Sequence, residues 1–327
     1  MTRIWTIAIA LLAFAAAALT PPEMQVDTQL KSYKRAQGVS GSLKSIGSDT
    51  LNNVMAQWAD EFRKFYPNVT IEIEGKGSKT APPALIEGQA QFGPMSRPMK
   101  NEEIDAFERA FGYKPTALRA GIDTLAVFVH RDCPLEEISI DDLTRVFSVK
   151  GSDLTWGDLG VTNPRFRSTP IALYGRNSAS GTYDFFKQNA LGGADFKASV
   201  KEQPGSSAVV QAISTDVFGM GYSGTGYRLA EVKMLRVSVD GNDSVEPNYE
   251  NALSGDYPLA RFLYVYINHD ARKALDPLRA EFVRMIFSRE GQEAVVKQGY
   301  YPVPAKIANE ELKKLGLLEE SSAKAGS

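Results

Sequence analysis

The chain has 327 residues, of which 43% are hydrophobic and 23% are charged. This length allows two structural units, each with its own core, and the composition is that of an ordinary globular protein. The formal charge of -2 disfavours nucleic acid binding, which usually needs a basic face, so any bound anion must be held by local donors.

The N-terminus has the three parts of a secretory signal. Arg3 supplies a positive charge, residues 4–14 are apolar, and Ala16 and Ala18 are small residues suited to cleavage. The alternative is a membrane anchor, but the apolar run is short for a span and ends in alanines. We therefore expect residues 1–20 to be a cleaved signal peptide. No cysteine lies near the cleavage site to carry a lipid, so we expect a soluble protein in a Gram-negative periplasm.

Residues 21–41 are polar and have no clear periodicity, which indicates a linker. The folded part then begins with an expected strand, SLKSIGS, and a helix from about Thr50 whose apolar residues recur at helical spacing. Those residues are Leu51, Val54, Met55, Trp58, Phe62 and Phe65. The alternating stretch TIEIE predicts a second strand, and a second helix is expected from about Pro83 to Gly88.

Two amphipathic helices are predicted further along the chain. One covers NEEIDAFERAFG, with Asn101 as its expected cap, and the other covers SIDDLTRVF, with Ser139 as its cap. Between them, the nearly continuous apolar run DTLAVFVH is typical of a buried strand in a parallel sheet.

The second half of the chain continues the alternation. The expected strands are IALY, FGMGYSG and RFLYVYIN, the expected helix is GSSAVVQAIS, and Asp276 followed by Pro277 predicts another helix start. Strands that alternate with helices favour an α/β fold with largely parallel sheets. Residues 317–327 are expected to be a disordered tail.

Three glycine-bearing turns lie between an expected strand and an expected helix. They begin at Gly47, Gly75 and Gly175 and read GSDT, GKGSKT and GRNSASGT. The first turn of a helix has backbone N–H groups without partners and a partial positive charge, so it accommodates a phosphate-like anion. Serine and threonine there are usually only helix caps, but the third turn also has Arg176, which a cap does not need. The three turns together predict an anion site.

The sequence does not indicate a catalytic site. Neither His130 nor His269 stands at metal-ligand spacing from Cys, Asp or Glu. There is no G-x-S-x-G nucleophile motif, and GKGSKT lacks the spacing and ending of a nucleotide-binding P-loop. The single cysteine, Cys133, cannot form an internal disulfide and is interpreted as idle. We therefore expect no enzyme activity, no metal and no cofactor.

Several dispersed stretches of the chain stand out together, first of all GRNSASGTYDFF. The others are ALIEGQAQFGPMSRPMKNEE, SIDDLTRVFS, TWGDLG and SREGQEAVVKQGYYPVP. In these stretches and their order the chain resembles the periplasmic phosphate-binding proteins that feed ABC-type phosphate importers. This resemblance runs from about Ser42 to Pro304. It implies an α/β two-lobed clamshell of the periplasmic-binding-protein type, with mostly parallel central sheets and a two-strand hinge. Lobe 1 would comprise residues 42–123 plus 262–316, and lobe 2 residues 124–261.

The resemblance also implies which residues bind the anion. They are Arg176, Ser180, Gly181 and Thr182 from the second lobe, and Asp49, the backbone N–H of Thr50, Ser78 and Ser96 from the first. Asp49 stands where many family members have a hydroxyl residue, and Ser96, followed by Arg97, stands where many have an aspartate. Asp49 is therefore either the missing acidic group of the site or only the N-cap of the helix that begins near Leu51.

The implied function is high-affinity binding of inorganic phosphate in the periplasm by a monomer, with delivery to an ABC transporter permease in the inner membrane. Two alternatives stay open. One is a periplasmic phosphate sensor or structural protein. The other is a secreted phosphatase on a related fold, which the absence of metal ligands and of an evident nucleophile disfavours.

Overall fold

The computed structural model describes residues 26–239, 241 and 243–318. The signal peptide expected over residues 1–20 lies outside these residues, as does the expected tail from residue 319 onward. Within the described part of the chain, no helix has both the length and the apolar character needed to cross a membrane.

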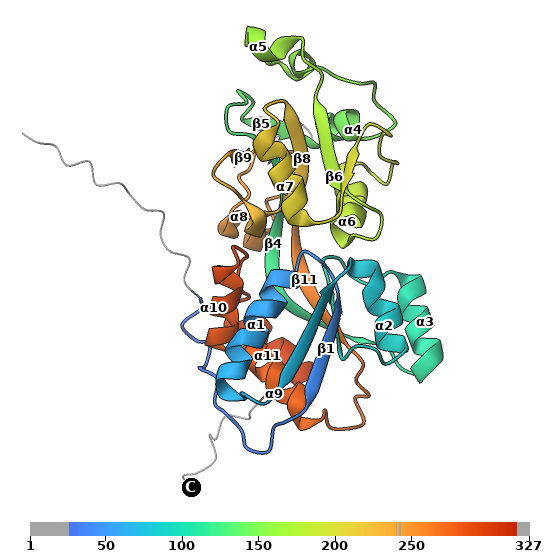
Figure 1. The fold of residues 1–327 in the computed structure, drawn as a ribbon, viewed down its shortest axis with the longest axis vertical. Coiled ribbons are helices and arrows are strands. Elements are labelled where there is room, and N and C mark those ends of the chain that lie inside the picture. The colour runs from blue at the N-terminus through green and yellow to red at the C-terminus, as the bar shows by residue number, and fades with distance from the viewer. Residues whose placement is uncertain (1–25, 240, 242, 319–327) are drawn as a thin grey trace, which may run out of the picture.

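The molecule is elongated, and its elements form a lower half and an upper half in Figure 1. The lower half contains β1 (Ser42–Gly47), α1 (Asn52–Phe65), β2 (Thr70–Gly75), α2 (Ala81–Ile86), β3 (Phe92–Met95), α3 (Asn101–Phe111), α9 (Pro277–Ile286), α10 (Arg289–Lys297) and α11 (Ala305–Lys314). The upper half contains β5 (Glu137–Ser139), α4 (Ile140–Phe147), α5 (Pro164–Arg167), β6 (Ala172–Arg176), α6 (Gly181–Ala190), β7 (Lys201–Gln203), α7 (Ser206–Thr215), β8 (Gly219–Gly224), β9 (Val232–Met234), β10 (Arg236–Ser238) and α8 (Tyr249–Ser254). Two strands, β4 (Thr116–His130) and β11 (Ala260–Ile267), pass between the halves. Short 3-10 helices cover Ser78–Thr80, Trp156–Leu159 and Thr225–Tyr227.

The α/β class is confirmed, and the sheets are mixed, so the prediction of parallel strands holds for the outer strands and is wrong for the central ones. The strands follow the order β2-β1-β3-β11-β4-β8-β6-β7, with β9 beside β4, and β5 and β10 form a separate pair. β1 is parallel to β2 and β3, and β6 is parallel to β7 and β8. The central strands β4 and β11 are antiparallel to each other and to their other neighbours.

Strand β4 shows why its sequence misled the prediction. Its residues up to Thr124 pair with β11 in the lower half, and those from Leu125 to Val129 pair with β8 in the upper half. Every residue from Ala120 to His130 is buried. A continuous apolar run therefore indicates only that both faces of a strand are covered. This central antiparallel strand is covered on both faces, as a strand in a parallel sheet would be.

Each half has its own cores. In the lower half, one cluster packs α1, α9, α10 and α11 against the sheet and includes Trp58, Phe282 and Val295. A second cluster lies under α2 and α3, on the other side of the sheet in Figure 1. In the upper half, α4 and α6 share one cluster, and α7 belongs to another. Helices thus cover both faces of the strands, which holds the strand ends in fixed positions.

The predicted helix starts agree with the structure in most places. Val54, Met55, Trp58 and Phe62 of α1 are fully buried, as their spacing indicates. The Ser139 hydroxyl accepts the N–H of Asp142 at the start of α4, and the Asp276 carboxylate accepts the N–H of Arg279 at the start of α9.

Two boundaries differ from the prediction. The N-cap of α3 is Lys100, and Asn101 is the first helical residue. The second helix, α2, begins at Ala81 rather than near Pro83, because Pro82 fits the first turn of a helix, where no N–H is needed.

The segment predicted as a linker, residues 21–41, contains no helix or strand from residue 26 onward, but it is anchored. Leu30 and Tyr33 are buried in the core of the lower half. The Tyr33 hydroxyl lies 2.7 Å from the Tyr66 hydroxyl and donates to Glu281 at 2.7 Å. The described part of this segment, residues 26–41, therefore packs along the lower half instead of hanging free. Leu317, at the start of the predicted tail, is also part of this core.

Candidate anion-binding site

The three glycine turns meet between the two halves. They follow β1 and β2 in the lower half and β6 in the upper half, at strand ends where α/β proteins commonly bind ligands. The hydroxyl oxygens of Thr50 and Thr182 lie 2.9 Å apart across the boundary. The backbone N–H of Lys79 also donates to the carbonyl of Ala179 across it, at 3.2 Å. The structure thus brings the predicted residues of the lower half against those of the upper half.

The assembled residues are enclosed. The residues that are at most 2% exposed are Thr50, Ser78, Ser96, Arg176, Ser180 and Thr182, and Gly181 is also buried. Asp49 is the most exposed of the set, with 24% of its side chain accessible. Polar groups in such a place need partners, so the hydrogen bonds decide what the site can hold.

Each of the three serine hydroxyls accepts at least one hydrogen bond from a neighbouring group. Ser180 is the N-cap of α6 and accepts the N–H groups of Thr182 and Tyr183 at 3.1 and 3.4 Å. Ser78 accepts the N–H of Ser96 at 3.1 Å, and the hydroxyl of Ser96 accepts from Ser48 at 3.1 Å. The hydroxyls of Ser78 and Ser96 also lie 3.3 Å apart, so one of them donates to the other. A hydroxyl has one hydrogen to give, so Ser180 and the remaining member of that pair can direct their hydrogens toward an anion. The first N–H of α6, at Gly181, also has no acceptor within its helix.

Arg176 lies at the end of β6, and its side chain is only 2% exposed. Its Nη1 lies 3.0 Å from Oδ2 of Asp49 and donates to the Ser206 hydroxyl at 2.6 Å. Nη2 donates to the carbonyl of Pro204 at 3.4 Å. Burial lowers the pKa of Arg176, and the nearby Asp49 carboxylate opposes that shift. Its Nε is buried and has no hydrogen-bond partner in the described part of the chain.

Asp49 does not cap the helix that follows it, so the capping interpretation is wrong. The N-cap of α1 is Leu51, and no side chain caps this helix. Oδ2 of Asp49 instead accepts the N–H of Ser206, at the start of α7 in the other half, at 2.8 Å. Together with Arg176, this contact places the carboxylate across the boundary at the edge of the enclosed site.

Three residues of this region were missed by sequence reasoning. Ser206 holds Arg176 and Asp49, as described above. Arg261 on β11 pairs with Asp123 on β4 at 2.7 Å, with 2% and 0% of their side chains exposed. A signal was present, because Arg261 and Asp123 interrupt apolar runs, and a charge in a buried strand requires a buried partner.

Arg97, which follows Ser96, does not turn toward the site. Its guanidinium forms two hydrogen bonds of 2.7 Å with Glu103 at the start of α3 and donates from Nε to Asp184 of α6 at 2.9 Å. Burial alone would lower the pKa of Arg97, but the two carboxylates outweigh this effect and raise it. Since Asp184 belongs to the upper half, Arg97 is an ion-pair link between the halves.

The described residues contain no cluster of His, Cys, Asp or Glu that could hold a metal ion. His130 accepts the N–H of Asp132 through Nδ1 at 3.1 Å. Cys133 is buried, and burial raises the pKa of its thiol to about 11, which keeps the thiol protonated.

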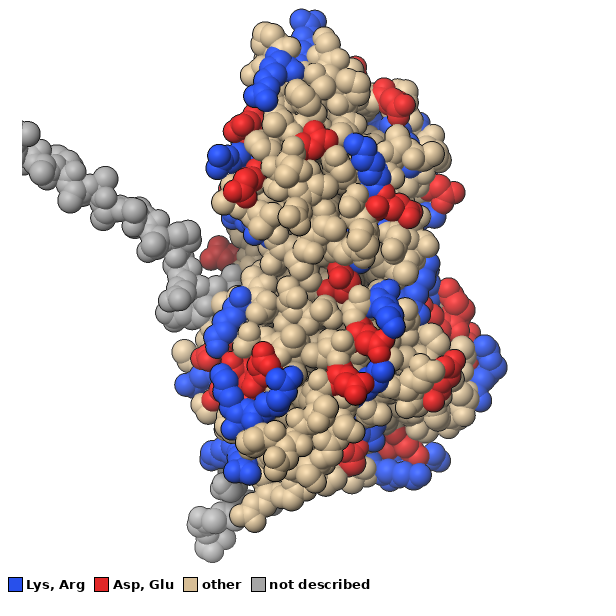
Figure 2. All heavy atoms as spheres, viewed as in Figure 1, with Lys and Arg blue, Asp and Glu red and all other residues tan. Residues whose placement is uncertain are grey.

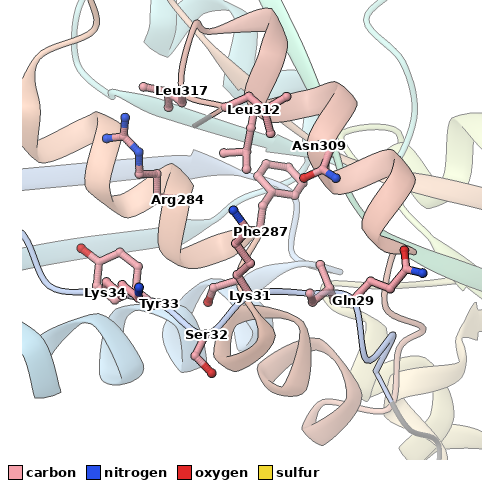
Figure 3. A pocket seen from close by; sticks show the side chains of 13 residues that line it. Gln29, Lys31, Ser32, Tyr33, Lys34, Arg284, Phe287, Asn309, Leu312 and Leu317 are labelled. Carbon is pink, nitrogen blue, oxygen red and sulfur yellow. The ribbon is translucent and has the colours of Figure 1, made fainter. Parts of the chain in front are cut away.

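A separate pocket of about 270 Å³ lies in the lower half, between residues 29–34 of the N-terminal segment and helices α9 and α11 (Figure 3). Its walls include the apolar side chains of Phe287, Leu312 and Leu317. Arg284 also lines it, but its guanidinium pairs with Glu281 at 2.6 Å. The pocket shares no residue with the enclosed site and lacks its arrangement of hydroxyl donors.

Surface charge does not single out another anion site. On the face shown in Figure 2, basic and acidic side chains are interspersed over both halves. This mixture fits the small net charge of -2 and leaves local donors as the means of holding an anion.

The chain is similar to known phosphate-binding proteins over most of its length. A family model described as the PBP superfamily domain matches residues 34–290. The phosphate-binding protein PstS of Pseudomonas aeruginosa is 50% identical over 299 residues, which cover 89% of this chain and 92% of that protein. PstS of Staphylococcus haemolyticus is 28% identical over 88% of this chain and 89% of its own length.

A solved structure has the same fold. It is a candidate phosphate ABC transporter substrate-binding protein from Clostridium perfringens with bound phosphate, and it matches with a TM-score of 0.68 and 25% sequence identity. The match covers 80% of this chain and 100% of the Clostridium perfringens chain. The family match and the half-identical relative, both extending over most of the chain, show that this chain belongs to the PBP superfamily and, within it, to the PstS phosphate-binding proteins.

Proposed function

We propose that this protein binds inorganic phosphate between its two halves and delivers it to an ABC-type phosphate permease. The observation that carries the proposal is the buried Nε of Arg176, which has no partner in the described part of the chain. A buried donor without an acceptor is unfavourable, and a phosphate oxygen would supply the acceptor. The phosphate-binding relatives support the same ligand, and they are binding proteins rather than enzymes.

The proposed ligand residues are the eight named from the sequence: Asp49, Thr50, Ser78, Ser96, Arg176, Ser180, Gly181 and Thr182. The guanidinium of Arg176 would supply the charge, and the hydroxyls, the backbone N–H of Thr50 and the first N–H of α6 would surround the oxygens. The serine hydrogen bonds support these roles, because Ser180 and one of the pair Ser78 and Ser96 keep a hydroxyl hydrogen to donate.

The two halves are proposed to be the lobes of a clamshell, with lobe 1 at residues 42–123 plus 262–316 and lobe 2 at residues 124–261. The hinge would lie in β4 and β11. The change of partner strand after Thr124 supports this boundary, since β4 leaves β11 there and joins β8. The cores of the halves support it as well, because residues 124–261 contribute only partly buried side chains, those of Tyr227, Tyr249 and Ala252, to the core of the lower half.

Phosphate should therefore close the molecule. The Thr50–Thr182 and Lys79–Ala179 contacts cross the boundary, and one anion that binds both sides would favour the closed form. Small-angle scattering should give a smaller radius of gyration with phosphate than without it. Identical profiles, with binding confirmed in the same sample, would contradict a hinge.

Asp49 should determine the selectivity between phosphate and sulfate. Near neutral pH phosphate still carries a proton that it can donate, whereas sulfate only accepts. Oδ2 of Asp49 is occupied by Arg176 and Ser206, and Oδ1 accepts no hydrogen bond from another described residue. A carboxylate oxygen facing the anion would accept the phosphate proton and repel sulfate. Asp49→Asn should narrow the ratio of the two dissociation constants by roughly tenfold, because an amide can donate to either anion.

The matched control for this selectivity is Asp184→Asn. Asp184 is also a carboxylate that pairs with an arginine across the boundary, but its partner is Arg97 and not Arg176. Its loss should weaken phosphate and sulfate equally. An unchanged ratio in Asp49→Asn would place the discriminating group elsewhere.

We further infer that the protein acts in the periplasm as a monomer and that its closed form docks on a permease in the inner membrane. The PstS relatives and the ABC transporter named for the Clostridium perfringens structure support this setting. A phosphate-uptake assay in cells that lack the protein should show a defect that the wild-type gene repairs.

The test of the proposed ligand is calorimetry on protein that has been unfolded, stripped of ligand and refolded. Phosphate and arsenate, which share a shape and carry a proton, should bind with one site per chain, and sulfate should bind far more weakly. Heat from none of the three anions would overturn the proposal.

A further inference from the structure

Arg261 lies beside the proposed site, at the junction of the two halves. It is near the start of β11, opposite Asp123 of β4. The Arg261 side chain is 2% exposed, and the Asp123 side chain is 0% exposed. A buried guanidinium has five N–H donors and no acceptor, so its partners show what it holds.

The partners of Arg261 come from both halves. Nε and Nη2 donate to Oδ2 of Asp123 at 3.0 and 2.7 Å, which balances the charge. Nη1 donates to the carbonyl of Ser96 in the lower half at 3.0 Å. Nη2 also donates to the hydroxyl of Thr182 in the upper half at 3.0 Å. Arg261 therefore touches one predicted ligand residue on each side of the boundary.

These contacts orient the donors of the site. A guanidinium can only donate, so Oγ1 of Thr182 is the acceptor and its own hydrogen must go to another oxygen. Oγ1 of Thr50 is within reach at 2.9 Å, but a negatively charged phosphate oxygen would be the stronger acceptor. The hydrogen bond from Arg261 to the Ser96 carbonyl likewise holds Ser96 in place, and the N–H of Ser96 donates to the Ser78 hydroxyl.

The ring of Phe185 limits the movement of the guanidinium. Its centroid lies 5.2 Å from Cζ of Arg261, a distance at which a cation and an aromatic face attract. Phe185 belongs to α6, the helix that begins with Gly181 and Thr182. Arg261 is thus attached to α6 at two places as well as to Asp123 and Ser96.

We infer that Arg261 is a positioning residue for the bound anion, which holds Thr182 and Ser96 as the halves close and directs the Thr182 hydroxyl at the ligand. This inference rests on the proposed function. The competing interpretation is that Arg261 only neutralises Asp123. The two interpretations differ in what they require of the side chain. Neutralising Asp123 requires only a positive charge, whereas positioning requires the planar guanidinium, whose N–H groups reach several acceptors at once.

Two variants separate these interpretations. Arg261→Lys keeps the charge beside Asp123 but cannot reach Ser96 and Thr182 together. The double variant Arg261→Gln/Asp123→Asn removes both charges and leaves no buried ion unpaired, so it can be measured even if the lysine variant folds poorly. Positioning predicts phosphate dissociation constants at least about tenfold weaker in both variants, with melting temperatures near that of the wild type.

A double-mutant cycle with Thr182→Val provides a readout that a purely structural role would not change. If Arg261 acts through the Thr182 hydroxyl, the loss of affinity caused by Thr182→Val should shrink when Arg261 is already lysine. The matched control is Arg119→Lys, since Arg119 is also an arginine of the central strands that bonds to a carboxylate, Glu311, and lies over an aromatic ring, Phe262. This control should bind phosphate as the wild type does.

The outcomes distinguish this inference from the proposed function. If the wild type does not bind phosphate, both fail. If the wild type binds phosphate and Arg176→Ala does not, but the lysine and double variants bind like the wild type, only the role of Arg261 is overturned. Additive effects in the cycle with Thr182→Val would also overturn it.

Discussion

Replacing Arg176 with alanine should weaken phosphate binding by about 2–5 kcal/mol, which is roughly thirtyfold to several thousandfold in the dissociation constant. The guanidinium is buried at the end of β6 and has one Nε donor without a described partner. Its removal would take away the main positive charge at the anion. It would also leave the Asp49 carboxylate, now 3.0 Å from Arg176, without its counter-charge beside that anion. Calorimetry on ligand-stripped protein measures this change.

Arg119→Ala is the control for this variant. It removes an arginine of similar size whose guanidinium bonds to Glu310 and Glu311, and these residues lie outside the proposed site. Its phosphate affinity should match that of the wild type. If Arg176→Ala binds phosphate as tightly as this control, the assignment of the site is wrong.

Gly181→Ala should prevent complete closure and weaken phosphate binding by about tenfold or more. A Cβ atom at Gly181 would lie 2.2 Å from Oγ and 2.8 Å from Cβ of Ser78, in the opposite half, and 2.8 Å from Oγ of Ser96. These distances are shorter than van der Waals contact allows, and a short serine side chain anchored by its own backbone cannot move far. The halves must therefore stay further apart, which separates the donors that surround the anion.

Two measurements distinguish blocked closure from unfolding in Gly181→Ala. The melting temperature should not fall, because alanine is a better helix residue than glycine and Gly181 begins α6. The radius of gyration should decrease less on addition of phosphate than that of the wild type. If Gly181→Ala has the phosphate affinity of the wild type and the same decrease in radius of gyration, the bound form does not bring Gly181 and Ser78 into this close contact.

The sequence was most informative where the deciding interactions are local. The apolar spacing of α1, the cap at Ser139 and the Asp276–Pro277 start each depend on residues within a few positions of one another, and each agrees with the structure. The ligand set was assigned by resemblance, which carried over positions that spacing alone would not have joined. The structure then places these positions against one another across the boundary.

What the sequence could not supply was strand direction and long-range pairing. The run DTLAVFVH has no feature that separates a parallel from an antiparallel central strand, because both are covered on two faces. The contact between Asp49 and Ser206 joins residues 157 positions apart, and that between Arg261 and Asp123 joins residues 138 positions apart. Such partners depend on the register of the whole sheet. For the same reason the capping interpretation of Asp49, which used only neighbouring residues, was wrong.

The proposed anion site is tested most directly by anomalous diffraction from crystals of the ligand-stripped protein grown with arsenate, which stands in for phosphate and scatters anomalously at the arsenic edge. We expect one strong peak per chain, between the halves, within hydrogen-bond distance of the Arg176 guanidinium and of the Ser78 and Ser180 hydroxyls. A peak only in the pocket between residues 29–34 and helices α9 and α11, or no peak at an arsenate concentration that saturates binding in solution, would show that the site is wrongly assigned.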